Sequence, residues 1–500
     1  MRAFHNSLLW GLSVVTLLIL AGCGDATPLS STSDIRAGGT TPGPTPFISF
    51  VPLSGQSLKD VVEYHYVIAA KEGAASKSVN VIYSRDALIR RGYYLDGSSA
   101  ATLPVFGLYA DYTNRVSVAL KFNDGSSQEF NLNIDAPEYV DTNGVYDRPN
   151  ILKKRSPDSA LGMNYFFMKS AISGPIVVDT DGEVRWVTPV YKNGQPSKFD
   201  DNGFVVGDVE STGIYRIELD GRTSSTSLIS TIYTMFHHNI DTGKFGLLGS
   251  LNTASNMESS LSEFSPSGTI INDWDFAEII ASYMRKQGDD PSVFVRPGTD
   301  WFHINAATYD PRDDSVIASS RENFVIKVDY STGDIKWILG DPTKYWYTFP
   351  SLRSKALVLE AGGLYPIGQH ATSINSAGLL MLFNDGGPSV NTPAGAPTGE
   401  SRLYSAVSAY EIDPIKMTAR EVLHFDYGKT ILSDVCSSVY EAQEGSMLVD
   451  YAAASNRQKA RLVGLDSSLK VIFDFEYASP ITCSTSWNAQ PIYFESMSIL

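Results

Sequence analysis

The most regular pattern in the chain is an alternation of apolar and polar residues in two neighbouring segments. Residues 115–122 and 129–134 place an apolar side chain at every second position, and residues 123–126 between them read Asn-Asp-Gly-Ser. A period of two is the spacing of side chains on one face of a strand, and Asp-Gly is typical of a hairpin turn. The pattern predicts a strand–turn–strand unit, which we assign to a small N-terminal β-sandwich domain over residues 47–145.

A second pattern recurs from about residue 150 onward. Each copy has an apolar strand that ends near a polar turn, and in most copies a second strand follows. The six copies lie at residues 176–186, 215–221, 261–270, 325–337, 409–414 and 462–473. Hairpin repeats of this size are typical of propeller blades. We therefore predict an all-β chain with a six-bladed β-propeller over residues 146–500; an array of β-sandwiches with coincidental hairpins is the alternative.

In such a propeller the turn of each copy joins the two outer strands of a blade, and the innermost strand lies upstream. Inner strands surround the central channel. Side chains at the starts of these strands are therefore expected to converge from different blades.

The first 23 residues have the layout of a lipoprotein signal peptide. Arg2 precedes an apolar stretch that ends in Leu20-Ala21-Gly22-Cys23. Small residues directly before a cysteine resemble the bacterial lipobox, so we expect lipid on Cys23. Gly24 is not the aspartate that favours inner-membrane retention, which favours the periplasmic side of the outer membrane. An ordinary signal peptide or a short membrane anchor is the alternative.

Composition adds two constraints. Residues 24–46 are rich in Gly, Pro, Ser and Thr and have too few apolar side chains to offset the cost of ordering, which predicts a flexible linker. The net charge of −16 argues against a nucleic-acid partner, because a phosphate-binding face needs clustered Lys and Arg. A small anionic substrate remains compatible, since a few local cations can offset a distant acidic surface.

Histidines are few and clustered. Four of the seven lie in three segments of similar layout, residues 236–240, 300–305 and 368–374. Aligned on the hairpins, each segment places one histidine at the start of a predicted inner strand. These are His238, His303 and His370; His237 precedes His238, which we prefer because Asn239-Ile240 follows it.

Three interpretations of converging imidazoles are open: hydrogen-bonded core residues, a metal site with three histidine ligands, and nucleophilic catalysis with supporting cations. Arg321 ends a predicted strand of the same unit as His303. A guanidinium is unfavourable beside a metal ion but binds two oxygens of an oxyanion at once. Arg321 therefore favours an oxyanion substrate; a structural ion pair with Glu322 is the alternative.

These segments resemble a known family. Trp301-Phe302-His303-Ile304-Asn305, Ser319-Ser320-Arg321, residues 328–340 and Gly368-Gln369-His370 together look like the bacterial arylsulfate sulfotransferase family, and residues 106–114 resemble its N-terminal module. The resemblance covers residues 47–500. It implies a six-bladed propeller with an N-terminal β-domain, no cofactor and no metal.

The activity that the resemblance implies is transfer of a sulfuryl group from an aryl sulfate to a phenol without a nucleotide donor. The family nucleophile, which forms a sulfohistidine, falls on His370. The supporting positions fall on His238, His303 and Arg321. His303 or His238 would exchange the proton of the phenol, and Arg321 would hold the sulfuryl oxygens. The expected partners are these small molecules and, through the lipid anchor, a membrane; a homodimer is left open.

The two cysteines that remain after Cys23 are Cys436 and Cys483. They occupy places in the last units that correspond to the histidine positions. We predict a disulfide between them in an oxidising periplasm, although their spacing neither requires nor forbids it. The family is associated with a close-spaced pair, so this chain departs from it here.

Clustered aromatic residues precede His370. Tyr345, Trp346 and Tyr347 are predicted to stack on a phenol ring near the channel mouth, with packing of the loop as the alternative. Asn305 is also predicted to contact the substrate.

Two other functions stay open. One is a non-catalytic cell-surface propeller that binds a protein or glycan partner, which would tolerate substitution of the His and Arg set. The other is a metal-dependent hydrolase or lyase. A propeller hosts many functions, so the fold alone does not decide.

Overall fold

The two alternating segments form the predicted hairpin in the computed structural model, which describes residues 34–500. Strand β7 (Tyr112–Phe122) pairs antiparallel with β8 (Ser127–Ala136). Along β7 the side chains of Val116, Val118 and Leu120 are buried, whereas Ser117 and Lys121 are exposed. This is the period of two read from the sequence.

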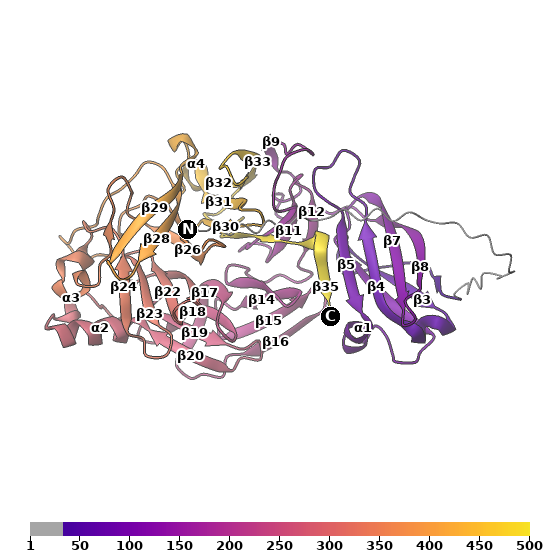
Figure 1. Ribbon diagram of the computed structural model, residues 1–500, viewed down its shortest axis with the longest axis horizontal. Coiled ribbons are helices and arrows are strands. Elements are labelled where there is room, and N and C mark those ends of the chain that lie inside the picture. Colours follow the sequence, from indigo (N-terminus) through magenta and orange to yellow (C-terminus); the bar gives the residue numbers. More distant parts are fainter. Residues whose placement is uncertain (1–33) are drawn as a thin grey trace, which may run out of the picture.

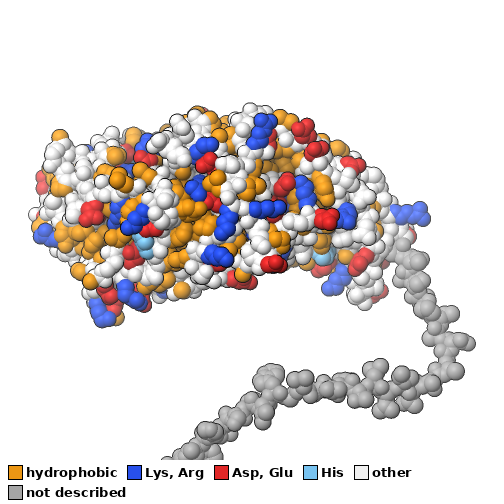
Figure 2. All heavy atoms as spheres, turned by 90° about the horizontal axis from the view of Figure 1, so that it is seen from above, with side chains coloured by type: hydrophobic (Ala, Val, Ile, Leu, Met, Phe, Trp, Pro, Cys, Tyr) orange, Lys and Arg blue, Asp and Glu red, His pale blue; other side chains and the backbone are white. Residues whose placement is uncertain are grey.

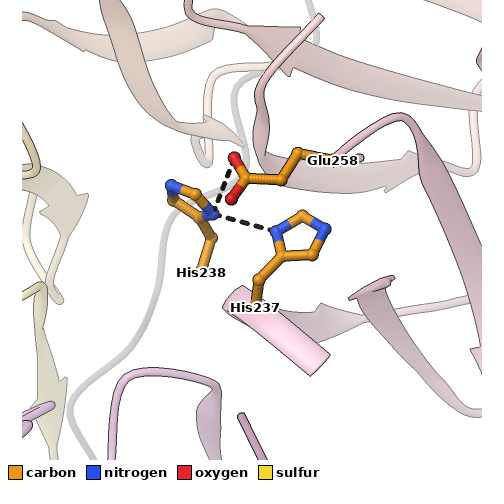
Figure 3. A group of neighbouring side chains, drawn as sticks. All are labelled: His237, His238 and Glu258. Carbon is orange, nitrogen blue, oxygen red and sulfur yellow. Dashed lines mark hydrogen bonds and ion pairs between the residues drawn. The ribbon is translucent and has the colours of Figure 1, made fainter. Parts of the chain in front are cut away.

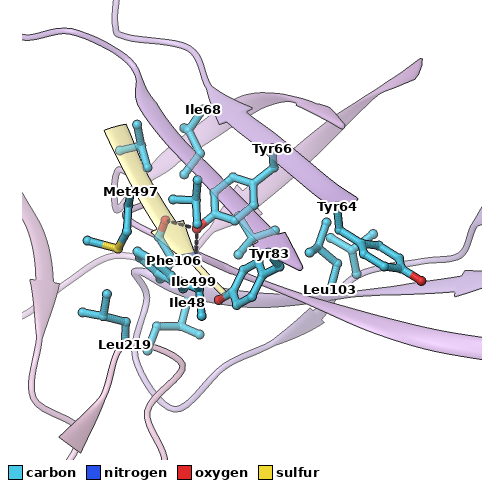
Figure 4. Packing of buried hydrophobic residues seen from close by; sticks show 14 of the residues in the cluster. Ile48, Tyr64, Tyr66, Ile68, Tyr83, Leu103, Phe106, Leu219, Met497 and Ile499 are labelled. Atoms are coloured by element: carbon cyan, nitrogen blue, oxygen red, sulfur yellow. Dashed lines mark hydrogen bonds between the residues drawn. The ribbon is translucent and has the colours of Figure 1, made fainter. Parts of the chain in front are cut away.

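The hairpin belongs to a sandwich of two sheets. One sheet contains β1 (Arg36–Ala37), β2 (Thr41–Pro42), β3 (Ile48–Ser54) and β6 (Ala100–Phe106). The other contains β4 (Val61–Ile68), β5 (Val79–Ser84), β7, β8 and β35 (Met497–Ile499). Short helices η1 (Gln56–Asp60) and α1 (Arg85–Arg90) connect strands. Figure 4 shows the core, where the Tyr66 hydroxyl lies 3.2 Å from the Phe106 carbonyl oxygen.

The predicted domain boundaries need two corrections. Residues 34–46 are not part of a flexible linker, because β1 and β2 pair with β3. The C-terminal residues do not belong to the propeller, because β35 runs parallel to β5 of the sandwich (Figure 1). The predicted signal peptide and Cys23 lie outside the described residues.

Six sheets of four or five strands make up the propeller. From the inner strand outward, the first two sheets are β34 (Ala489–Ile492), β10 (Tyr165–Met168), β11 (Ile176–Asp179) and β12 (Val184–Val187), then β13 (Ser197–Asp200), β14 (Gly203–Gly207), β15 (Gly213–Glu218) and β16 (Thr223–Ser227). The next two are β17 (Tyr233–Thr242), β18 (Leu247–Thr253), β19 (Ser260–Phe264) and β20 (Ile270–Asp275), then β21 (Ile304–Asp310), β22 (Ser315–Ser320), β23 (Val325–Asp329) and β24 (Ile335–Leu339). The last two have five strands each: β26 (Gln369–Ile374), β27 (Leu380–Asn384), β28 (Ala406–Asp413), β29 (Thr418–Phe425) and β25 (Val358–Leu359), then β30 (Ser438–Glu441), β31 (Met447–Ala453), β32 (Lys459–Leu465), β33 (Val471–Ala478) and β9 (Asn150–Lys153).

The repeat read from the sequence is confirmed. The turns at residues 180–183, 265–269, 330–334 and 466–470 each join adjacent outer strands of one sheet. Neighbouring inner strands contact one another from β13 round to β34. The first sheet receives its inner strand from the far end of the chain, because β34 pairs with β10. Closure of this kind leaves few unpaired strand edges.

Helices are few and connect strands. They are α2 (Phe276–Gln287), η2 (Pro291–Val293), η3 (Tyr345–Thr348), α3 (Pro350–Arg353), η4 (Tyr427–Lys429), α4 (Ala454–Arg457) and η5 (Phe494–Ser496). The longest, α2, begins where the Asp275 carboxylate accepts the N–H groups of Ala277 and Glu278, and it ends at Gly288, whose φ is 90°. Both are common helix-end signals.

The sandwich and the propeller share one continuous apolar core, which contains Leu219 and Trp186 of the propeller and Phe106 of the sandwich. The guanidinium of Arg185, fully buried, pairs with Asp179 at 2.9 Å and donates to the Gly107 carbonyl at 2.7 Å. Because a buried charge is stable only when it is paired and hydrogen-bonded, these contacts fix the two bodies against each other.

The surface is mixed in charge. Figure 2 shows basic and acidic side chains interspersed on the face in view, rather than a block of one sign. Among residues 34–500, no helix has the length and apolar character needed to cross a bilayer.

Candidate active site

The three histidine segments come together on inner strands, although the predicted position at a strand start is wrong for His238, which lies in the middle of β17. His238 lies in β17, His303 directly precedes β21, and His370 lies in β26. The pairing of each strand with its neighbour shifts register at or next to the histidine. Such bulges re-aim side chains, and His238 and His303 have positive φ values of 51° and 55°. Non-glycine residues in this conformation are uncommon and cluster at functional sites.

Three imidazoles form a hydrogen-bonded chain. Nδ1 of His237 lies 2.9 Å from Nδ1 of His238, and Nε2 of His238 lies 3.1 Å from Nε2 of His303. Figure 3 shows the first of these contacts with Glu258 beside it. Each N···N contact holds one proton. If His303 donates from Nε2, then His238 must donate from Nδ1 to His237.

Two carboxylates hold the charge of His303. Its Nδ1 lies 2.5 Å from Asp300 Oδ2 and 2.8 Å from Glu258 Oε2. Burial opposes the charged form, but Glu258 and Asp300 outweigh it and raise the pKa of His303 to about 10. Burial, with the charge of His303, holds the pKa of His238 well below its usual value although Glu258 opposes this. One imidazole is therefore cationic and its neighbour is neutral.

His370 is neutral and has a defined tautomer. Its Nδ1 lies 2.9 Å from the Gly368 carbonyl oxygen, which can only accept, so the proton is on Nδ1 and Nε2 carries the lone pair. The side chain is buried. Burial and the guanidinium of Arg321 lower the pKa of His370 to about 3. An unprotonated ring nitrogen is the form that a nucleophilic imidazole needs.

Arg321 is held rigidly near His370. Nε lies 3.2 Å from Asp385 Oδ2, an atom that is also 3.9 Å from His370 Nδ1. Nη1 lies 3.1 Å from Glu322 Oε1, so the ion pair considered as an alternative is present. The remaining acceptors are the carbonyl oxygens of Pro388 at 3.4 Å and Asp434 at 3.2 Å. Three of the five guanidinium N–H groups therefore donate hydrogen bonds, and the Nε–H faces Asp385 in an ion pair.

The four predicted side chains occupy one region. His238 and His303 touch, His370 and Arg321 share Asp385, and the backbone N–H of Arg321 donates to the His303 carbonyl at 3.1 Å. The positive charge of His303 also contributes to lowering the pKa of His370.

Several partners were not found by sequence reasoning. Glu258 lies in the loop between β18 and β19, and its carbonyl oxygen accepts the Ile304 N–H at 2.8 Å. Lys344, almost fully buried, donates to the carbonyl oxygens of Arg321 and Glu322. Only Asp300, three residues before His303, carried a local signal, because that spacing lets a carboxylate reach the imidazole.

The predicted aromatic contact is corrected. Trp346 is 1% exposed and its indole N–H donates to the Asp341 carbonyl, so its ring has no face for a substrate. Tyr345 packs against Phe349, and Tyr347 packs against Trp346. Loop packing, the alternative, is what the structure has.

Asn305 is buried and its amide N–H donates to the Gln369 carbonyl at 2.8 Å, which ties β21 to β26. In the described part of the chain its carbonyl oxygen has no hydrogen-bond partner. A contact of Asn305 with the substrate stays a prediction.

An aromatic ring that was not predicted does reach the site. The Trp487 ring centroid lies 5.1 Å from that of His238, edge to face, and the residue is partly exposed. Trp487 also packs against the disulfide between Cys436 and Cys483, which is confirmed. The bond joins the loops that precede β30 and β34.

The site also offers metal-ligand chemistry. The donor atoms of His237, His238 and Glu258 lie within 4.8 Å of one another, as do those of Glu258, Asp300 and His303. The shared protons described above account for the same short contacts without an ion.

Comparison with known proteins identifies the relatives of this arrangement. Residues 151–488 match the family described as arylsulfotransferase (ASST), and residues 70–137 match the arylsulfotransferase Ig-like domain. The chain is 23% identical to the arylsulfate sulfotransferase AssT of Escherichia coli O6:H1, with 83% of this chain and 82% of that protein covered. It is 22% identical to AssT of Lelliottia amnigena, with 77% and 79% covered.

Similarity to solved structures is weak. Apo AztD from Citrobacter koseri is 11% identical, covers 86% of this chain and 98% of that one, and has a TM-score of 0.30. The β-propeller domain of Cps50 (Swd1) from Myceliophteria thermophila is 10% identical, covers 66% and 100%, and has a TM-score of 0.34. Nothing about the site rests on these two likenesses.

The charge of His303 is open to direct measurement. Its folded-state pKa, about 10, lies above the unfolded value of about 6.5. The protonated imidazole of His303 therefore contributes its full stabilisation of the folded state below pH 6.5, and this contribution is lost as the pH rises through 10. In NMR titrations of ring-labelled protein we expect His303 to stay protonated at pH 8, and Glu258→Gln to lower its pKa. Exposed Glu444→Gln is the control; a wild-type His303 that titrates near 6.5 would contradict the assignment.

Proposed function

The chain belongs to the arylsulfotransferase family, and on this premise we propose that it moves a sulfuryl group from an aryl sulfate to a phenol through a sulfohistidine at His370. The family match and both AssT relatives support aryl-sulfate sulfotransferase activity; the sulfohistidine step is our addition. No nucleotide donor is needed in this scheme.

The observation that carries the proposal is the state of His370. Its Nδ1–H donates to the Gly368 carbonyl, and burial with Arg321 keeps the ring unprotonated. Nε2 therefore presents a lone pair, on an imidazole whose pKa the charge of Arg321 lowers. Sulfuryl transfer, like phosphoryl transfer, requires an in-line nucleophile and positive charge near the transferred oxygens.

In the first half-reaction Nε2 of His370 forms a bond to sulfur, and the bond between sulfur and the aryl oxygen breaks. The departing phenolate takes the proton of His303 Nε2, and the hydrogen bond from this nitrogen to His238 breaks. In the second half-reaction a phenol returns its proton to His303 and attacks the sulfur, and the N–S bond breaks. Both half-reactions use one proton and one site, so the enzyme returns to its starting state.

We assign the proton transfer to His303 rather than His238. The two carboxylates at His303 raise its pKa to about 10, close to the value of about 10 for a phenolic hydroxyl. Proton transfer is most effective between groups of matched pKa, and such catalysis typically contributes ~10²–10⁴-fold. His238, neutral and bonded to His303, would orient that imidazole.

Arg321 acts chiefly through its charge. Both N–H groups of Nη1 and one of Nη2 donate to protein acceptors. The second N–H of Nη2 and the Nε–H, which faces Asp385 in an ion pair, are left for sulfuryl oxygens. The two-oxygen grip expected from the sequence would use these two N–H groups and would compete with the ion pair between Nε and Asp385.

Trp487 takes over the role predicted for the aromatic loop. Its partly exposed indole lies against His238, and the disulfide next to it fixes its position. An aromatic ring of the substrate placed beside it would gain about 0.5–1.5 kcal/mol beyond its burial.

Trapping of the intermediate tests the nucleophile. After mixing with 4-nitrophenyl sulfate and quenching in alkali, we expect a mass increase of one sulfuryl group on the peptide that contains His370. His370→Asn should abolish the adduct and lower phenol-dependent turnover by more than roughly 10³-fold, since it removes the nucleophile.

His65→Ala is the matched control, because His65 lies in the sandwich and contacts Asn80. An adduct on another residue would contradict the assignment to His370. Wild-type protein with neither adduct nor turnover would instead favour the non-catalytic binding function, and loss of activity with a chelator would favour the metal enzyme.

Substitution of Trp487 tests the ring contact. We expect Trp487→Ala to lower kcat/KM for aryl sulfates roughly 3- to 10-fold, mainly through KM, and Trp487→Phe to restore most of it. Tyr347→Ala removes a partly exposed ring outside the site and should leave KM unchanged. Equal effects of Trp487→Ala and Tyr347→Ala on KM would refute the contact.

We also propose that the chain is a lipoprotein on the periplasmic side of the outer membrane. The lipobox at Cys23 supports this, and so does the disulfide, because such bonds persist in oxidising compartments. Cys23→Ala should move the chain from the membrane fraction to the soluble fraction; a variant that stays with the membrane would rule out lipid on Cys23.

A further inference from the structure

His237 is the one member of the histidine chain that the proposed mechanism leaves without a role. It lies in β17 directly before His238, and its side chain is buried. In a regular strand two successive side chains point to opposite faces of the sheet. Here the two rings meet instead, with their Nδ1 atoms 2.9 Å apart (Figure 3). The backbone of β17 must therefore depart from a regular strand at this point.

Two irregularities of the backbone accompany this contact. The pairing of β17 with β18 shifts register between Phe236 and Ile240, and His238 has a φ of 51°. Strained segments of this kind cluster at functional sites, where they aim side chains. Aiming His238 alone would not require a second imidazole at the same place.

Glu258 adds an oxygen that accepts no hydrogen bond. Its Oε2 is buried and lies 3.6 Å from Nδ1 of His238 and 2.8 Å from Nδ1 of His303. The Nδ1–H of His303 donates to Asp300, so that Glu258 Oε2 has no hydrogen-bond donor among residues 34–500. Polar atoms removed from water are normally satisfied, so a buried carboxylate oxygen without a donor is open to a further positive partner.

His237, His238 and Glu258, which we name the zinc triad, match the ligands and the spacing of a zinc site. Two histidines and one glutamate are a known ligand set for zinc, with a fourth position left for water. Bonds of about 2.0–2.2 Å in a tetrahedron place ligand atoms roughly 3.3–3.6 Å apart. The two nitrogens at 2.9 Å and the nitrogen and oxygen at 3.6 Å are close to this spacing, and all three donor atoms lie within 4.8 Å of one another.

We propose that Zn²⁺ binds to the zinc triad through Nδ1 of His237, Nδ1 of His238 and a carboxylate oxygen of Glu258, and that its binding inhibits sulfuryl transfer. The metal replaces the proton that the two Nδ1 atoms share. Imidazole ligands favour zinc over Mg²⁺ and Ca²⁺, which prefer oxygen ligands. The side chain of Glu258 is 17% exposed, so its carboxylate is within reach of an ion from solvent.

The inhibition follows from the tautomer of His238, and this half of the inference rests on the proposed function. With zinc on Nδ1, the single N–H of neutral His238 is on Nε2, which lies 3.1 Å from Nε2 of His303. His238 then donates to His303, whose Nε2 must carry a lone pair to accept. The proton that the departing phenolate takes in the first half-reaction is therefore absent, and one proton leaves the site for each ion bound.

Anomalous diffraction at the zinc edge tests the binding on the whole chain. Crystals soaked in zinc acetate should show a peak about 2.0–2.2 Å from the donor atoms of all three residues of the zinc triad. His237→Asn should remove this peak, and His424→Ala should retain it. His424 is the matched control, because it contacts two carboxylates outside the site. The absence of a peak, peaks only at the surface, or a peak that leaves out His237 or His238 would overturn the proposal.

Turnover of aryl sulfates tests the inhibition. Zinc should slow the wild type, and a chelator should restore the rate. In His237→Asn the zinc concentration for half inhibition should rise by at least roughly 10- to 100-fold, since loss of a ligand costs no less than loss of a residue behind one. In His424→Ala it should stay the same. Zinc bound at the triad without any effect on the rate would refute the inhibitory role.

The leaving group provides a test that needs no variant. Zinc should slow formation of the adduct more strongly with phenyl sulfate than with 4-nitrophenyl sulfate, because a more basic phenolate depends more on a proton. Equal inhibition with both donors would refute the loss of the proton from His303. A zinc peak at the triad of a chain without turnover would support the zinc site and contradict the proposed function.

Discussion

The pairing of β34 with β10 is the contact on which the arrangement of the site depends. The inner strands of the propeller carry the histidines of the site. Among the described residues, the ring of inner strands is complete only when β34 pairs into the first sheet. β34 also begins next to Trp487, which touches His238. The pairing that closes the ring of strands therefore also places Trp487 against His238 and completes the site.

Within that ring, identical side chains are given different chemistry by their neighbours. His303 has two carboxylates on one nitrogen, and His370 has a backbone carbonyl on one nitrogen and a guanidinium nearby. The first environment stabilises a cation and the second disfavours one. Burial lowers the pKa of both imidazoles. The carboxylates reverse this at His303, which becomes an acid, whereas Arg321 adds to it at His370, which stays neutral.

The sequence predicted those parts that depend on local pattern. Period-two alternation located β7 and β8, and the recurring turns located the outer hairpins, because strand faces and turns are set by nearby residues. The recurrence of histidines predicted that the inner strands carrying them converge on one site. Glu258 could not be found in this way, because it reaches His303 from the loop of another sheet. Trp346 was misassigned because an aromatic residue in a loop has the same sequence signal whether it packs inward or faces a ligand.

The linker was misjudged for a related reason. Its Gly and Pro content is that of a flexible segment, yet β1 and β2 are held by hydrogen bonds to β3, whose backbone offers partners that composition cannot reveal.

The short strand β35 has a consequence for how the chain is made. It pairs with β5 of the sandwich, so the first domain to be synthesised lacks an edge strand until the last residues have emerged. Residues 489–499 complete the propeller and then the sandwich in immediate succession. Domains generally fold in order from the N-terminus as they are synthesised. Here neither domain can reach its final form until residues 489–499 have been synthesised.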